Sequence, residues 1–317
     1  EYAIQLEVTG SGASPGRATV PAKILSALMQ SVKEDKVELQ EKQKNLLVKT
    51  ETRETRINGM DPEDFPLLPK IKKAAHFSIP APLLHRGVES VLPAVFLSEF
   101  KPELAGVLFS ISPDALRLAA TDTFRLAEKI VPFPEKRKEE RFSFILPYRA
   151  AQELGRVFSG RDEEARVSLG DNQVLFEGDG IMLISRLIEG SFPDYAGIIP
   201  KTFETTVFLG REEMVSAARA SSIFASRLQE VTLAFHPNSL DVTSSNPEVG
   251  EYKTRVGAHT TGRDITISFN YHYLLDGLQQ LEEDEVFIGL NSENSPSLVR
   301  NKEDHSFVYV VMPVRIP

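Results

Sequence analysis

One structural unit occurs three times in this chain at nearly constant length, and this repeat constrains the fold more than any other feature. Each copy opens with a helix start, at Pro21, Pro147 and Asn270. Each copy closes on a hydrophobic residue followed by proline, at Phe65-Pro66, Phe192-Pro193 and Met312-Pro313. The opening residue and the closing proline are 45, 46 and 43 residues apart. A repeat of this length is a small domain used several times, so we expect the function to depend on how the copies assemble.

Within each copy, helical spacing comes first and strand-like alternation follows. In the second copy Ala150, Ala151, Leu154 and Phe158 recur at the spacing of an amphipathic helix. Residues 167–169 then alternate as in a strand. The segments between copies repeat this order with a second helix, for example over residues 212–224. The pattern predicts the α+β class, in which each domain has two helices packed on antiparallel sheets.

The repeat also predicts the domain limits. We expect a first domain at residues 1–71, a second at 72–200 and a third at 201–317. The first domain holds only its second half. By analogy with the second domain, about 50 residues that would carry its first helix and strands are missing before Glu1.

Composition narrows the functional class. No apolar run approaches the roughly 18 residues of a membrane span, so we expect no membrane partner. The absence of cysteine fits a reducing compartment, and we expect a cytoplasmic protein. The net charge of −9 argues against a protein coated in nucleic acid, but it permits a local basic track on an acidic body.

We find no constellation of residues that would carry catalysis. The six histidines show no metal-ligand spacing, and neither a nucleophile elbow nor a Walker loop is present. The glycine-rich stretch at residues 10–16 lacks dinucleotide spacing and is interpreted as a loop. Asp122 and Asp194 lie in turns, where side-chain capping is their ordinary role. The sequence predicts a protein that is not an enzyme and needs no cofactor.

Basic residues recur on the expected helices. Arg149 and Arg156 are seven residues apart and share a helix face. Further cations on or just after the other helices are Lys23, Arg86, Arg219 and Arg227. Charge spacing alone favours solvated helix faces. The alternative is a set of helices that present cations to a phosphate backbone without reading its sequence.

Several stretches resemble the bacterial DNA polymerase III β sliding clamp, and together they cover essentially the whole chain in the family's order. They are TVPAK at 19–23, LAGVLF at 104–109, AATDTFRLA at 119–127, GSFPDY at 190–195, SNPEVGE at 245–251 and YVVMPVR at 309–315. The resemblance implies a head-to-tail homodimeric ring of similar domains, whose helices line a hole threaded by duplex DNA. It also implies that partners bind by short peptides in a hydrophobic cleft between domains two and three. These partners include the polymerase III α subunit and the clamp loader.

The resemblance assigns the cleft residue by residue. The deep apolar subsite matches Leu126, Pro193, Ile198, Val310 and Met312. The wall matches Thr121, Thr123, Phe124 and Arg125. The neighbouring groove matches Lys101, Leu104, Asn270, Tyr273, Pro296, Pro313, Val314 and Arg315. Each large apolar anchor of a bound peptide would contribute about 1.5–3 kcal/mol on burial. Without the resemblance, Val310, Val311 and Met312 are better interpreted as a last strand packed in a core.

The chain departs from the family at several of these positions. Thr123-Phe124 replaces a common Gly-His pair, which makes the wall bulkier, and Gly197 stands where an arginine is frequent. For the dimer, Ile223 and Phe224 match the apolar pair with which domain three grips domain one of the other subunit. The opposing strand contains Thr55 and Ile57, with Thr55 at an often aromatic position. For DNA, Arg86, Arg149 and Arg156 match basic positions of the channel helices.

The sequence therefore predicts a processivity factor, a ring that tethers a polymerase to DNA by topology. The alternative is a peptide-binding adaptor that uses the same cleft but never closes on DNA. A ring requires a dimer, whereas an adaptor could be a stable monomer, so the size in solution separates the two.

Overall fold

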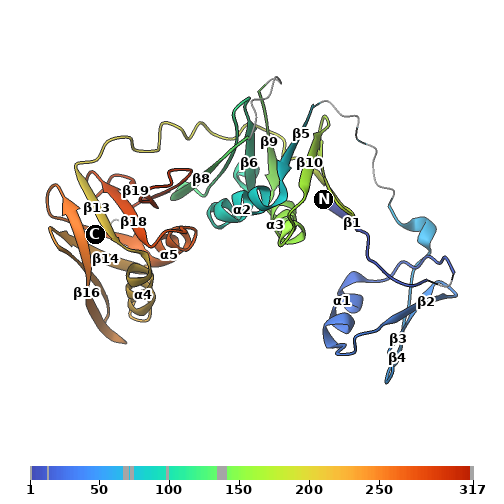
Figure 1. Cartoon of the computed structure of the whole chain (residues 1–317). Helices are drawn as coiled ribbons and strands as arrows, with labels where there is room; N and C mark the ends of the chain where they lie inside the picture. The colour runs from blue at the N-terminus through green and yellow to red at the C-terminus, as the bar shows by residue number, and fades with distance from the viewer. Residues whose placement is uncertain are drawn as a thin grey trace. The chain divides into compact units, whose positions relative to one another are not determined.

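A computed structural model describes residues 2–12, 14–66, 71, 75–97, 100–133 and 141–314 (Figure 1). These residues form two compact units, one within residues 7–66 and one from residues 2–6 together with described residues of 71–314. The predicted groove residue Arg315 lies outside the described residues. Among the residues described, no helix is long and apolar enough to cross a membrane.

The smaller unit is one helix on one antiparallel sheet. Helix α1 (Ala22–Ser31) is followed by β2 (Glu38–Lys42), β3 (Asn45–Lys49) and β4 (Glu54–Ile57), which pair in the order β2-β3-β4. The buried core of this unit is Leu46, Val48 and Ile57, and Leu25, Leu28 and Met29 of the helix pack against it. The apolar stripe of α1 explains this packing, because these residues share one helix face.

The larger unit contains two complete helix-and-strand domains. The first has β5 (Ala75–Pro80), α2 (Ala81–Val91), β6 (Gly106–Ile111), β7 (Ala115–Thr121), β8 (Arg125–Pro132), β9 (Phe142–Pro147), α3 (Tyr148–Phe158), β10 (Glu164–Leu169), β11 (Gln173–Gly178) and β12 (Ile181–Arg186). The second has β13 (Thr205–Gly210), α4 (Arg211–Ser222), β14 (Glu230–His236), β15 (Ser239–Asn246), β16 (Gly250–Thr261), β17 (Ile265–Asn270), α5 (Tyr271–Gln279), β18 (Glu285–Leu290), β19 (Ser297–Asn301) and β20 (Phe307–Val311). The expected α+β class, with two helices in each of these domains, is confirmed.

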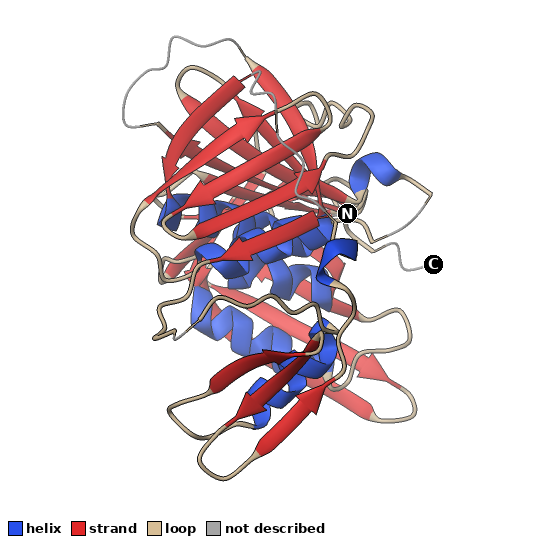
Figure 2. Ribbon diagram, turned by 90° about the vertical axis from the view of Figure 1, so that its right-hand side faces the viewer, coloured by secondary structure: helices blue, strands red, loops and turns tan. Residues whose placement is uncertain are grey.

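The strands form broad antiparallel sheets with helices against them (Figure 2). Helix α2 packs beside α3, and α4 beside α5. In α3, Ala151 and Leu154 are buried while Arg149 and Arg156 are exposed, as the amphipathic spacing predicts. His85 of α2 lies 2.8 Å (Nδ1) from the carbonyl oxygen of Gly155 in α3, which ties the pair together.

Strand pairs join successive domains. Strand β8 pairs with β20 in the register Ala127↔Tyr309, which merges strands of both domains into one sheet of 12 strands. Strand β1 (Tyr2–Leu6) pairs with β12 in the same antiparallel sense, in the register Ile4↔Leu183. This pairing groups residues 2–6 with the larger unit although the repeat places them in domain one, and the predicted domain limits remain a prediction.

Candidate functional site

A cavity of about 490 Å³ opens beside the β8·β20 pairing. It is formed by the turn between β7 and β8, the start of α5 and the segment after β20. Its lining residues are Thr123, Phe124, Asn270, Tyr273, Met312, Pro313 and Val314. Residues from both domains of the larger unit therefore meet at one hollow, which is mainly apolar with an amide and a phenol at its edge.

Side-chain hydrogen bonds shape the turn that carries Phe124. The Oδ1 atom of Asp122 accepts from the amides of Phe124 and Arg125, both at 2.9 Å. The hydroxyl of Thr121 donates to the Arg125 carbonyl at 2.7 Å and accepts from the Thr123 amide at 3.2 Å. These bonds confirm the capping role expected for Asp122. They also hold Thr123 at a φ of 77°, a left-handed conformation that β-branched residues rarely adopt.

Arg125 connects the turn to α5. Its Nε donates to Asp122 Oδ2 at 3.0 Å, its Nη1 donates to Asp276, and its guanidinium lies 4.3 Å above the Tyr273 ring. Phe124 stacks on the same tyrosine, with ring centroids 6.5 Å apart. Burial raises the pKa of the Tyr273 hydroxyl above its ordinary value, and the Asp122 carboxylate raises it further. The neutral Tyr273 ring therefore contacts both the Arg125 guanidinium and the Phe124 ring.

Backbone hydrogen bonds place the segment after β20. The Met312 amide donates to the Phe124 carbonyl at 2.8 Å, and the Val314 amide donates to the Ser268 carbonyl at 2.8 Å. Asn270 caps α5, because its Oδ1 accepts from the amides of His272 at 2.9 Å and Tyr273 at 3.4 Å. The cap fixes the first turn of the helix, from which Tyr273 faces the cavity.

Comparisons with known proteins identify the family. The domain family described as DNA polymerase III beta subunit, central domain, matches residues 78–194, and its C-terminal domain matches residues 196–315. The beta sliding clamp of Synechocystis is 30% identical over 335 residues, covering 99% of this chain and 86% of that protein. The chain belongs to the beta sliding clamp family. The beta sliding clamp of Bacillus subtilis is 28% identical over 308 residues, covering 95% of this chain and 81% of that protein.

Solved sliding clamps have the same fold. The clamp of Pseudomonas aeruginosa bound to griselimycin superposes with a TM-score of 0.90 at 27% identity, covering 100% of this chain and 86% of that one. The DNA polymerase III beta subunit of Thermotoga maritima gives a TM-score of 0.90 at 25% identity, with the same coverage of both chains. The resemblance seen in the sequence motifs is confirmed.

The structure brings only part of the predicted beta-clamp cleft to an open surface. The seven lining residues named above were all expected from the sequence. Four other predicted residues are covered, namely Leu104, Leu126, Val310 and Val311, which are at most 3% exposed. Leu126 and Val310 are register partners in the β8·β20 pairing. As register partners, Leu126 and Val310 lie side by side on one face of the paired strands, and both are covered.

The remaining predicted cleft residues lie outside the cavity lining. Pro193, Gly197 and Ile198 are exposed on the segment between β12 and β13. Lys101 is exposed, whereas Thr121 and Pro296 are half-buried. Asp276 contributes to the site through Arg125 but was missed in the sequence. The two residues are 151 positions apart, and no local signal connects them.

The predicted DNA-contact cations are all exposed. Arg86 lies on α2, Arg149 and Arg156 on α3, Arg219 on α4, Arg227 just after α4, and Lys23 on α1 of the smaller unit. Two of them have a carboxylate nearby: Arg86 pairs with Glu282 at 3.4 Å and Arg156 with Glu153 at 2.6 Å. Such exposed pairs are weak, so a phosphate can compete for these guanidinium groups.

The predicted dimer residues differ in accessibility. Ile223 is 68% exposed at the end of α4, and Phe224 beside it stacks on Tyr252 with centroids 6.0 Å apart. Thr55 is half-buried on β4. Ile57 is only 4% exposed and belongs to the core of the smaller unit. Its side chain packs inside its own unit, so a contact from this strand would rest on Thr55 and the backbone.

Proposed function

We propose that this chain is a DNA polymerase processivity factor. In this proposal it forms a homodimeric ring around duplex DNA and tethers replication proteins through the cleft at the β8·β20 pairing. The protein acts by topology and contributes no catalytic step.

The repeated strand pairing between domains is the observation that best supports a ring. In β1·β12 and β8·β20, the strand that ends the first half of one domain pairs with the last strand of the next domain. By the same repeat, β16 corresponds to β8, and β4 corresponds to β12 and β20. In the described chain, residues 250–257 of β16 pair with β15 alone, and β4 pairs with β3 alone.

Two copies would use these open edges head to tail. Strand β16 of one subunit would add to β4 of the other, with Ile223 and Phe224 beside the new pairing. Two such contacts, related by twofold symmetry, close a ring, and closure leaves no edge for further growth. The mostly exposed Ile223 gains an apolar environment in this arrangement, which favours the contact.

Duplex DNA would pass along the helices. The cations Lys23, Arg86, Arg149, Arg156, Arg219 and Arg227 supply scattered contacts to phosphate without reading bases. Scattered contacts suit sliding, because retention comes from closure of the ring and tight affinity would slow movement. The net charge of −9 is compatible with this arrangement, since the acidic groups can occupy the outer surface.

Retention on closed DNA tests the ring. We expect the full-length protein to be a dimer by light scattering, and to stay on nicked circular DNA after the organism's clamp loader has acted. Cutting the circle should release it, because a ring slides off a free end. A monomer that binds cleft ligands but leaves circular and linear DNA equally fast would refute the ring and establish the adaptor.

We propose griselimycin as a ligand of this cleft, because a clamp of the same fold was solved bound to it. We expect Met312→Glu to weaken griselimycin binding about 100-fold by calorimetry, since a carboxylate in the lining removes the apolar contact that makes burial of a ligand anchor worth about 1.5–3 kcal/mol and would itself be desolvated. Leu39→Glu is the matched control, because Leu39 is 58% exposed on β2, outside the cavity lining. Equal affinity of both variants would refute the assignment of the cleft.

A further inference from the structure

The segment from residue 187 to residue 199, here called the linker, connects β12 to the domain that begins with β13. Backbone hydrogen bonds fix its start. The Leu187 amide donates to the Asn172 carbonyl at 2.9 Å, and the Ile188 amide donates to the Ile145 carbonyl of β9 at 3.0 Å. From this anchored start the linker continues to Pro193 and Ile198, the two linker residues assigned to the deep subsite of the cleft.

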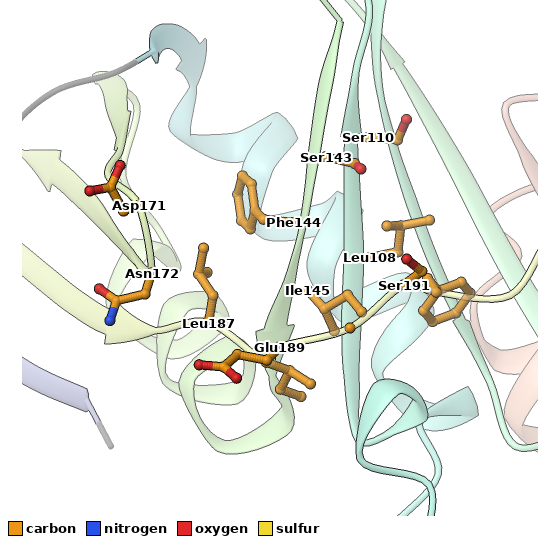
Figure 3. A pocket seen from close by; sticks show the side chains of 13 residues that line it. Leu108, Ser110, Ser143, Phe144, Ile145, Asp171, Asn172, Leu187, Glu189 and Ser191 are labelled. Atoms are coloured by element: carbon orange, nitrogen blue, oxygen red, sulfur yellow. The ribbon is translucent and has the colours of Figure 1, made fainter.

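The first half of the linker borders an open cavity. A hollow of about 440 Å³ lies between residues 187–192, the β6 and β9 strands and the turn at Asp171 and Asn172 (Figure 3). Leu108 and Ile145 line it from the strands, and Glu189 and Ser191 line it from the linker. Since a cavity offers no packing partner on one side, this half of the linker gains little from dispersion contacts. Its position depends on the anchors at its two ends.

Tyr195 supplies the second anchor. Its hydroxyl donates to Glu128 Oε2 of β8 at 2.6 Å, and its ring meets Phe192 edge-on with centroids 6.0 Å apart. Glu128 is only 8% exposed, and its other partner is Arg117 of β7 at 3.8 Å. Burial raises the pKa of the Tyr195 hydroxyl well above its ordinary value, and the Glu128 carboxylate raises it further, so the phenol remains a donor. Removing that donor would leave a buried carboxylate with one distant partner.

The Tyr195–Glu128 hydrogen bond joins two segments that both carry predicted cleft residues, the linker and β8. On the linker, the Tyr195 carbonyl accepts from the Ile198 amide at 2.9 Å, and Asp194 Oδ1 accepts from the Ala196 amide at 3.2 Å. These bonds make one turn of residues 194–198. On β8, Glu128 and Leu126 are two residues apart and share a face of the strand. The hydroxyl therefore binds the turn to the strand that carries Leu126, one of the residues assigned to the deep subsite.

We propose that Tyr195 is a positioning residue whose hydrogen bond to Glu128 holds the linker against β8, so that Pro193 and Ile198 form one wall of the peptide cleft. The inference rests on the proposed function, because it concerns the same cleft. It adds a residue that touches no ligand and acts through the linker. The phenylalanine variant separates this role from packing, because it keeps the ring and removes only the donor.

Two measurements on Tyr195→Phe test the inference. Hydrogen exchange in the ligand-free protein should accelerate about tenfold at the Ala196 and Ile198 amides, as expected for loss of a hydrogen bond to a charged group. Griselimycin affinity should fall about five- to tenfold, because binding must then order the linker. The melting temperature should fall by about 2–4 °C, because the buried Glu128 carboxylate loses its close donor. Tyr148→Phe is the matched control, since no side-chain hydrogen bond of Tyr148 is found in the described part of the chain, and it should leave both values unchanged.

A second variant tests whether Tyr195 acts through Glu128. Glu128→Gln keeps an acceptor for the tyrosine but removes the buried charge, so Tyr195→Phe should cost less affinity in that background than alone. Unchanged exchange at residues 196–198 in Tyr195→Phe would overturn the inference, whether or not the wild-type protein binds griselimycin. Accelerated exchange with unchanged affinity would also overturn it, because the linker would then form no wall of the cleft. Failure of the wild-type protein to bind griselimycin would count against the proposed cleft alone.

Discussion

Replacing Thr123 by glycine should stabilise this protein. Thr123 has a φ of 77°, and an L-residue pays about 1–2 kcal/mol in this region, with β-branched residues among the worst placed. Its hydroxyl has no hydrogen bond within the described residues, and the side chain is exposed, so little else is lost. Glycine removes the strain but costs about 0.5–1 kcal/mol in extra unfolded-state entropy. The difference predicts a net gain of about 0.5–1 kcal/mol.

Urea unfolding followed by circular dichroism measures this gain, with differential scanning fluorimetry as a second reading. Glu248→Gly is the matched control, because Glu248 lies in an exposed turn but has no positive φ. We expect the control to be destabilised by about 0.5–1 kcal/mol, since it pays the entropy without relief of strain. If both variants lose stability equally, the turn stores no strain at Thr123 and the reasoning fails.

Three further predictions concern the dimer interface, DNA binding and stability at low pH. Ile223→Glu should convert the dimer to a monomer in light scattering, since it places a charge in the proposed contact; a stable dimer would exclude this surface from the interface. Arg149→Ala should reduce the slope of log affinity for duplex DNA against log salt by about 1, and an unchanged slope would show that Arg149 contacts no phosphate. Hydrogen bonding to Arg255 lowers the pKa of Asp241 to about 2 from 3.8, so its stabilisation is present above about pH 4 and is lost as pH falls toward 2. The gap in melting temperature between wild type and Asp241→Asn should therefore shrink across that range, and a constant gap would contradict the assigned cause.

Local patterns predicted the helices and the fold class, because amphipathic spacing and alternation are properties of short segments. The buried face of α3 follows directly from Ala151 and Leu154. The pairing of β8 with β20 could not be predicted in this way, since it joins Ala127 to Tyr309 and depends on how two domains meet. The regular repeat length indicated only that the copies assemble, and it did not indicate which strands would pair.

For the candidate site, too, local motifs identified residues, whereas long-range packing determined their exposure. Family motifs identified Phe124, Tyr273 and Met312, which the structure places around one cavity. They did not indicate which matched residues would be open, because burial depends on the packing of distant strands. Leu126 is covered by the β8·β20 pairing, and Ile57 is covered by the core of its own unit. A motif identifies the position of a residue in the family, but the exposure of its side chain depends on what packs around it.

Arg125 connects the proposed cleft to the junction between the two domains. Its backbone is in register with Val311 in the pairing that joins the two domains, while its guanidinium binds Asp122 on one side and Asp276 on the other. The same guanidinium supports Tyr273 from above. Its side chain is largely buried, so both carboxylates would lose a charged partner if it were removed. Because these contacts share one guanidinium, we expect a ligand that repositions Tyr273 in the proposed cleft to alter the contact between the two domains as well.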